Sequence, residues 1–108
     1  MVFLEPADVW AFEATHRLTF VHTRLGRFDV DLTLAALDAS FDGRLLRVHR
    51  NWLVRPAAVR RMTRHSGEIL LHLGEQVGGE KLCIPVSREN ARRVRQVLLR
   101  DARGVRRC

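Results

Sequence analysis

Three short polar segments carry the side chains best suited to recognising a chemical partner. Each segment separates apolar runs and combines arginine with histidine or asparagine: Thr15-His16-Arg17, His49-Arg50-Asn51 and Ser87-Arg88-Glu89-Asn90. Arginine can bind O6 and N7 of guanine with two hydrogen bonds, and asparagine can bind N6 and N7 of adenine in the same way. Because loops are polar in most proteins, this composition alone leaves base recognition and an ordinary solvated surface equally open.

Catalytic and metal-binding patterns are weak by comparison. The sequence has 5 histidines, but none shows the HxH, HxxxH or HExxH spacing of metal ligands. His22 and His72 alternate with strand-like neighbours, so we interpret them as surface or half-buried strand residues. No serine lies in a nucleophile-elbow context, and Asp29 and Asp31 share one strand face where both are solvated. We therefore expect no enzyme activity, no metal and no other cofactor.

The 2 cysteines form no disulfide framework, and Cys83 alternates with apolar neighbours as a small core residue would. No apolar run approaches the roughly 20 residues that a membrane-spanning helix needs. The first residues, 1–8, lack the basic and apolar regions of a signal peptide. These patterns predict a cytoplasmic protein with no membrane contact.

Charge is concentrated in the middle of the chain. The formal net charge is +7, and every basic residue except Lys81 is arginine. Residues 1–42 carry 7 acids and 3 bases, whereas residues 43–66 carry 7 bases and no acid, and residues 67–108 carry 9 bases and 5 acids. Such a basic stretch favours one face that binds a polyanion. A solvated surface, or a genome rich in arginine codons, would also account for it.

Hydrophobic periodicity predicts a mainly β fold with two helices. We expect strands over 8–14, 18–23, 28–32, 45–48, 52–54, 59–62, 69–73 and 81–86. Thr33 is the expected cap of a short internal helix that Gly43 ends, and Ser87 is the expected cap of a C-terminal helix. Connections this short favour antiparallel pairing. Trp52 is expected to be structural, packed beside Leu46 and Val54.

The chain resembles the LytTR family of DNA-binding domains over residues 3–99. The resemblance depends above all on two motifs at their present separation, Arg-Val-His-Arg and Pro-Val-Ser-Arg. The residues that carry it are Phe12-Glu13-Ala14, Phe20-Val21-His22-Thr23, Gly26, Leu34, Leu37, Leu46-Arg47-Val48-His49-Arg50-Asn51-Trp52-Leu53-Val54 and Ile84-Pro85-Val86-Ser87-Arg88.

This resemblance implies an elongated arrangement of antiparallel β-sheets whose loops enter successive major grooves of double-stranded DNA. It implies sequence-specific binding by a transcriptional regulator, typically as the output domain of a bacterial response regulator. By motif, the expected base contacts are His16, Arg50 and Arg88. The expected contacts to the DNA backbone are Thr15, Arg17, Asn51 and Ser87, together with Arg55 and Arg64 from the basic stretch.

The sequence departs from the family pattern at three positions that bear on base preference and on the role of Arg55. Members often carry serine where Asn51 stands, tyrosine where Trp52 stands and asparagine where Arg55 stands. We expect residues 1–108 to form a single domain with a basic tail over 100–108, either stand-alone or separated from a receiver domain. The family also implies a second copy bound to a direct repeat in the DNA.

Two other functions fit a small basic domain. An RNA-binding module would stack bases on exposed aromatic rings, but the 5 phenylalanines fall mainly at apolar positions and the chain has no tyrosine. A protein-interaction module of a sensor system would use the basic face to bind an acidic partner. Binding assays with DNA and RNA at matched salt separate these alternatives from the first.

Overall fold

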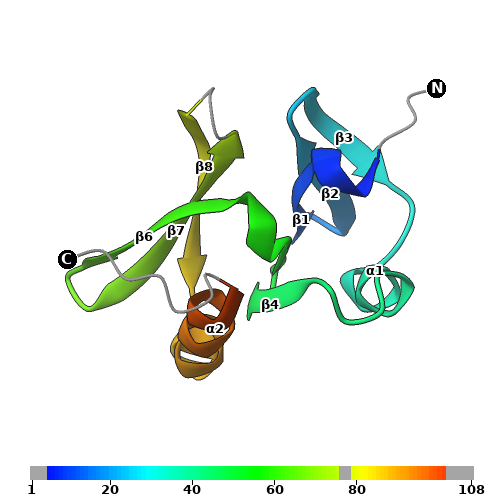
Figure 1. The fold of residues 1–108 in the computed structure, drawn as a ribbon. Coiled ribbons are helices and arrows are strands. Elements are labelled where there is room, and N and C mark those ends of the chain that lie inside the picture. Colours follow the sequence, from blue (N-terminus) through cyan, green and yellow to red (C-terminus); the bar gives the residue numbers. More distant parts are fainter. Residues whose placement is uncertain (1–4, 76–78, 102–108) are drawn as a thin grey trace.

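The computed structural model describes residues 5–75 and 79–101. Its elements follow one another along the chain with short connections (Figure 1). In order they are η1 (Pro6–Asp8), β1 (Val9–Thr15), β2 (Leu18–Thr23), β3 (Gly26–Val30), α1 (Leu34–Ser40), β4 (Leu46–His49), β5 (Trp52–Val54), η2 (Pro56–Ala58), β6 (Val59–His65), β7 (Glu68–Glu75), β8 (Gly79–Val86) and α2 (Arg88–Asp101).

Two antiparallel sheets make up most of the fold, which confirms the predicted mainly β class. The first has the strand order β3-β2-β1-β5-β4, and the second has the order β6-β7-β8. Strands β4 and β5 follow α1 in the chain, yet β5 pairs with β1 through Glu13 opposite Trp52. Residues far apart in sequence are therefore neighbours at the ends of the first sheet.

The first sheet has an apolar core on each of its faces. Strand β5 shows the alternation: Leu53 packs into one cluster, while Trp52 and Val54 belong to the other. Helix α1 covers the first cluster through Leu34 and Leu37. The second sheet and α2 cover the other cluster, which includes Leu46, Val48, Val54, Leu71, Leu73, Ile84 and Val94. The two helices thus lie on different sides of the first sheet (Figure 1).

Several local predictions are confirmed. The Thr33 side chain accepts a hydrogen bond from the backbone nitrogen of Ala36 at 3.1 Å and so caps α1. Gly43 follows α1 with a φ of +71°, a conformation that favours glycine. Trp52 is partly buried against the cluster that contains Leu46 and Val54, as its pattern predicted.

Three sequence interpretations need correction or extension. Cys83 is exposed rather than buried, because Ile84 and Val86 occupy the core-facing positions of β8. Strand β6 continues to His65, beyond the predicted end, because it pairs with β7 over its whole length. Helix α2 extends to Asp101, and the rest of the predicted basic tail, 102–108, lies outside the described residues.

Neither helix in the described part of the chain has the length and apolar character needed to cross a bilayer.

Candidate nucleic-acid interface

The first two polar segments lie side by side at one end of the first sheet. Strand β1 ends where β5 begins, because the two strands are antiparallel. The backbone nitrogen of Ala14 donates a hydrogen bond to the carbonyl oxygen of Asn51 at 2.9 Å. The β1–β2 turn with His16 is therefore held against the β4–β5 turn with Arg50.

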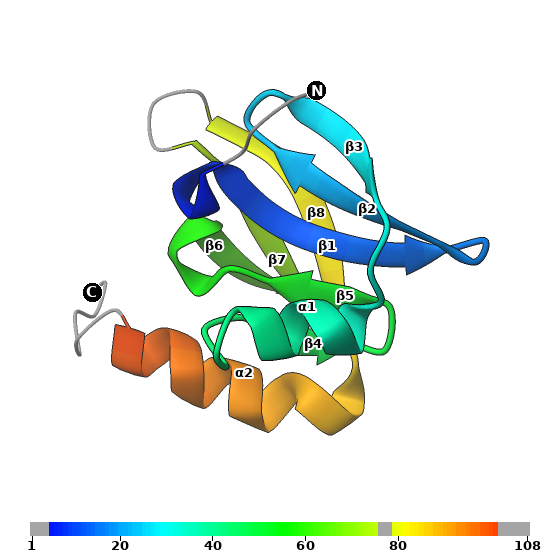
Figure 2. The same cartoon turned by 90° about the vertical axis from the view of Figure 1, so that its right-hand side faces the viewer.

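The third segment joins the same end from the second sheet. The backbone nitrogen of Ser87 donates to the carbonyl oxygen of Val48 at 2.9 Å. The start of α2, with Arg88, consequently lies beside the end of β4 (Figure 2). Two backbone hydrogen bonds thus connect all three sequence-predicted segments into one edge of the molecule, which we call the loop end.

The β1–β2 turn contains two side chains in an unusual backbone conformation. His16 and Arg17 have φ angles of +50° and +65°, as the two central residues of a type I′ turn require. Glycine or asparagine normally occupies such positions, and strained residues cluster at functional sites. Both side chains are exposed, and the Thr15 Oγ1 and His16 Nδ1 atoms share a hydrogen bond of 3.1 Å. The turn therefore presents a histidine and an arginine to solvent at the expense of local backbone stability.

Arg47 holds the β4–β5 turn in place. Its Nε donates to the carbonyl oxygen of His49 at 3.1 Å, and its Nη2 donates to that of Arg50 at 2.8 Å. The backbone nitrogen of Asn51 donates to Nδ1 of His49 at 3.2 Å. With its backbone fixed in this way, the exposed Arg50 side chain projects from an ordered turn. Sequence reasoning did not identify Arg47 as functional, although one charge within an apolar strand was a usable signal.

A second unpredicted arginine connects the β4–β5 turn to the start of α2. Arg93 Nη2 donates to the carbonyl oxygen of Arg47 at 2.8 Å and to Oδ1 of Asn90 at 2.6 Å. Asn90 Nδ2 in turn donates to Oγ of Ser87 at 2.6 Å. The Ser87 hydroxyl is therefore bonded to a side-chain amide. The backbone carbonyl oxygen of Ser87 accepts a hydrogen bond from the backbone nitrogen of Asn90 at 3.1 Å. The network fixes the second and third segments relative to each other.

A hollow of about 230 Å³ opens between these elements. The β6–β7 turn forms one wall, a contribution that the sequence did not indicate. The residues around the hollow are His49, Ser66, Gly67, Glu68, Ile69, Pro85, Val86, Ser87, Arg88 and Ala91. Because α2 begins here, its unpaired backbone N–H groups and positive dipole end face this region. Arg88 and the start of α2 thus place positive charge at the hollow, and Glu68 places one carboxylate there.

Arg64 and Arg55 lie at opposite ends of the molecule. Arg64 is exposed on β6 opposite Ile69, which in turn pairs with Val86, so Arg64 belongs to the loop end. Arg55 follows β5 at the other end, where its guanidinium donates to the carbonyl oxygens of Val9 and, at 2.9 Å, Ala7. The structure therefore places Arg55 away from the other sequence-predicted site residues.

Burial lowers the pKa of Arg55 below its ordinary value, and the nearby charge of Arg60 lowers it further. The guanidinium of Arg55 is thus partly removed from solvent and bonded to two backbone carbonyls. This environment favours a structural role, in which Arg55 connects the residues before β1 to the end of β5.

Four arginines at the loop end have no hydrogen bond or salt bridge from their side chains within the described residues: Arg17, Arg50, Arg64 and Arg88. All four are exposed. Exposed guanidinium groups without a bonded protein partner can bind phosphate oxygens or the O6 and N7 atoms of guanine. Within residues 5–75 and 79–101, no group of three or more histidine, cysteine or acidic side chains is arranged to hold a metal ion.

Comparisons with known proteins identify the family and the fold. The sequence model of the LytTr DNA-binding domain family matches residues 1–99. The structure is similar to that of a LytTr DNA-binding domain from Bacillus cereus, with a TM-score of 0.71 and 20% sequence identity over 85% of this chain and 82% of that chain. At this identity the structural likeness shows the fold. No curated protein matches the chain.

Proposed function

The chain belongs to the LytTr DNA-binding domain family, and on this premise we propose that it binds a specific double-stranded DNA site through its three loops and regulates transcription. The loops enter the major groove, which is wide enough to admit protein elements and displays a distinct pattern at each base pair. The family is one of DNA-binding domains rather than enzymes. The proposal also includes a single domain over residues 1–108 and a cytoplasmic location.

One observation carries the proposal: two backbone hydrogen bonds bring the three polar segments together at one edge of the molecule. Three exposed side chains there, His16, Arg50 and Arg88, are assigned to base edges. Contacts to the DNA backbone are assigned to Thr15, Arg17, Asn51, Arg64 and Ser87. Arg55 is omitted from this set, since its guanidinium is bonded to backbone carbonyls at the other end.

Recognition by stacked RNA bases has little support in the arrangement of aromatic rings. Phe12 packs against Phe41 in the core, with ring centroids 5.6 Å apart. The half-buried Phe20 ring is covered by Arg27, whose guanidinium carbon lies 3.7 Å from the ring centroid. These rings do not form the open stacking platform that RNA-binding modules use.

Salt dependence of DNA binding tests the proposal. The experiment first selects a cognate duplex from random sequences and then titrates it at several salt concentrations. We expect Arg64→Ala to weaken binding to all duplexes alike and to reduce the log–log salt slope by about 0.9, the value for one lost phosphate contact. Arg24→Ala is the matched control, because Arg24 is exposed on the β2–β3 turn and pairs with Asp8 at 3.6 Å.

Affinity that hardly changes between low and moderate salt would contradict the proposal, as would selection of no sequence from the random pool.

A related measurement concerns stoichiometry. The proposed arrangement of two copies on a direct repeat predicts that duplexes carrying two half-sites bind two domains, whereas duplexes with one half-site bind one.

A further inference from the structure

Strand β6 forms an open edge of the second sheet. In the order β6-β7-β8, and among residues 5–75 and 79–101, it pairs with β7 on one side only. Most of its side chains are exposed, among them Arg60, Arg61 and Met62. An edge strand presents backbone N–H and C=O groups that an additional strand can pair with. Within the described residues, the other edge of the same strand thus has no strand partner.

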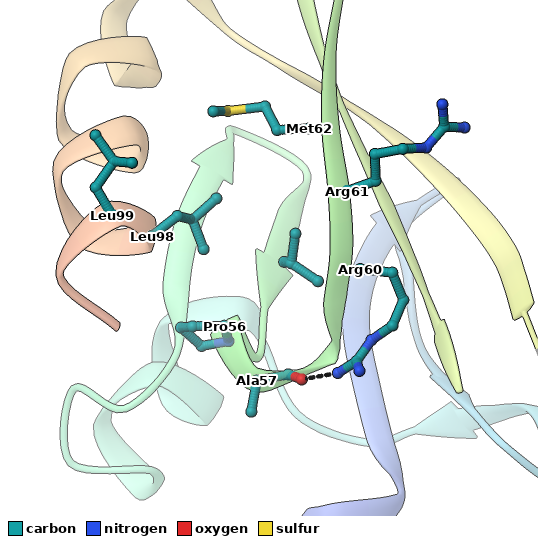
Figure 3. A pocket seen from close by; sticks show the side chains of 8 residues that line it. Pro56, Ala57, Arg60, Arg61, Met62, Leu98 and Leu99 are labelled. Carbon is teal, nitrogen blue, oxygen red and sulfur yellow. Dashed lines mark hydrogen bonds between the residues drawn. The ribbon is translucent and has the colours of Figure 1, made fainter. Parts of the chain in front are cut away.

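An apolar groove of about 370 Å³ runs between β6 and the C-terminal half of α2 (Figure 3). The residues that line it are Pro56, Ala57, Val59, Arg60, Arg61, Met62, Leu98 and Leu99, and the guanidinium groups of Arg60 and Arg61 point away from Leu98 and Leu99 (Figure 3). Met62 and Leu99 are 38% and 54% exposed, respectively, although both are large apolar residues. A second hollow of about 220 Å³ continues from Met62 toward Arg64 and Arg95. An apolar surface thus lies directly beside the open edge of β6.

The charged residues that line the two hollows are all arginines, and one of them, Arg61, is paired with Glu80. No acidic residue lines either hollow in the described part of the chain. Arg60 donates to the carbonyl oxygen of Ala57, and Arg61 is bonded to Glu80 at 2.8 and 2.9 Å. Arg95 is exposed and makes no side-chain hydrogen bond or salt bridge within the described residues. A carboxylate on an occupant would therefore complement Arg95, the arginine of α2 that lines the second hollow.

We propose that an extended, acidic segment of a partner protein binds here, adding a strand to the free edge of β6. Its alternate apolar side chains enter the groove between Met62 and Leu99, while its carboxylates face Arg95. This mode of recognition takes affinity from backbone hydrogen bonds and specificity from alternate side chains. The groove is lined by the C-terminal half of α2, away from Arg88, and the inference does not rest on the proposed DNA binding, although a strand paired along all of β6 would also cover Arg64 at the loop end.

Charge argues against the two occupants that this chain itself could supply. A second copy pairing through its own β6 would bring Arg60, Arg61 and Arg64 close to the same arginines, and like charges across a strand pair are destabilising. Residues 102–108 carry three arginines and no acid. Charged edge residues commonly prevent strands from self-association.

Anisotropy measurements with a labelled peptide test this inference. The probe has roughly eight residues, enough to pair along β6, and alternates glutamate with valine. We expect it to bind the wild-type chain and to lose at least about tenfold in affinity, or about 1.4 kcal/mol, on Leu99→Asp. Leu25→Asp is the matched control, because Leu25 on the β2–β3 turn is 53% exposed and Leu99 is 54% exposed.

Further probes and variants identify the binding mode. A probe with alternate backbone nitrogens methylated should bind at least about tenfold more weakly if backbone pairing to β6 contributes. A probe that alternates lysine with valine should not bind. Arg95→Glu provides a second surface variant, and thermal melting of each variant verifies that it is folded.

The inference fails if the acidic probe does not bind the wild-type chain, or if Leu99→Asp and Leu25→Asp weaken it equally. It also fails if Leu99→Asp weakens the cognate duplex as much as it weakens the peptide, because the groove would then belong to the DNA surface. If Leu99→Asp loses affinity for the peptide and keeps its affinity for the duplex, the inference is supported. If the wild-type chain binds the peptide but binds no duplex, only the proposed function is contradicted.

Discussion

Arginine serves different purposes at the two ends of the molecule. At the loop end, the guanidinium groups of Arg17, Arg50 and Arg88 are exposed and have no bonded partner within the described residues. At the opposite end, Arg55 donates to the carbonyl oxygens of Ala7 and Val9, and Arg60 donates to those of Ala57 and Ala58. The same side chain is thus available for binding at one end and part of the folded framework at the other.

The difference comes from the backbone around each arginine. Near Arg55, the chain enters β1 and leaves β5, and the carbonyl oxygens there need donors. At the loop end, backbone groups bond to one another or to Arg47 and Arg93, which leaves the outer arginines without protein acceptors. A basic sequence therefore indicates a binding surface only where the fold has not already used the charge.

The comparison between the two ends predicts the largest effect at Trp52. This residue begins β5, directly after the turn that carries Arg50. Its ring packs against the core and lies beside the ring of His22, with 5.2 Å between centroids. We expect Trp52→Ala to lower the free energy of unfolding by about 3–4 kcal/mol, because it removes a large packed side chain. Thermal and denaturant unfolding measure this effect. Loss of DNA binding at an unchanged melting temperature would make Trp52 a contact residue instead.

A structural role for Arg55 predicts the next largest effect. Arg55→Ala removes two charge-assisted hydrogen bonds to backbone carbonyls, and we expect the free energy of unfolding to fall by about 2–3 kcal/mol. The folded fraction should bind the cognate duplex with wild-type affinity. Arg24→Ala, which removes an exposed arginine at the same end, should change stability by less than about 0.5 kcal/mol. If Arg55→Ala weakens DNA binding while stability is unchanged, Arg55 belongs to the interface.

Arg88, at the loop end, is expected to show the opposite pattern to Arg55: little effect on stability and a large effect on DNA binding. Arg88→Ala should leave unfolding almost unchanged but cost about 1–3 kcal/mol on the cognate site and relax preference at one guanine. Arg88→Lys should restore only part of this, because lysine lacks the planar fork of donors. Titration against the cognate duplex and its single-base variants measures both. Equal losses on every duplex would assign Arg88 to phosphate, and a surface pair with Glu89 would be worth only about 0–1 kcal/mol.

The smallest expected effect is a gain in stability at the β1–β2 turn. The corresponding β6–β7 turn has Ser66 and Gly67 at φ angles of +51° and +83°. Replacing His16 by asparagine and Arg17 by glycine gives the β1–β2 turn its preferred residues, so the free energy of unfolding should rise by about 0.5–1 kcal/mol. DNA affinity should fall at the same time. A variant that gains stability and keeps its affinity would show that this turn does not contact DNA.

Much of the candidate site could be predicted from local sequence, because polar segments between apolar runs mark turns. The positions of His16, Arg50 and Arg88 at turns or at a helix start follow from that pattern. Their arrangement in one row does not, because it depends on the pairing of β1 with β5 and on the contact between β4 and the start of α2. Such pairings join distant parts of the chain, and the local sequence does not encode them.

Arg55 and Cys83 show what local sequence could not supply. The hydrogen-bond acceptors of Arg55 lie 46 and 48 residues away in the sequence, so the basic stretch alone gave no sign of them. Cys83 has apolar neighbours on both sides, but a strand buries alternate residues, and β8 buries Ile84 and Val86. In both cases the missing information is tertiary.

The hydrogen bonds between Ala14 and Asn51 and between Ser87 and Val48 have a mechanical consequence for DNA recognition. They tie the loops to one another through the backbone, so the protein sets the distances between the three loops. Under the proposed function, a duplex would have to adjust its own bend and groove width to fit those distances. We then expect sequences that deform easily to bind more tightly, even at base pairs that no side chain touches. The stiffness of the DNA would thereby become part of what the domain recognises.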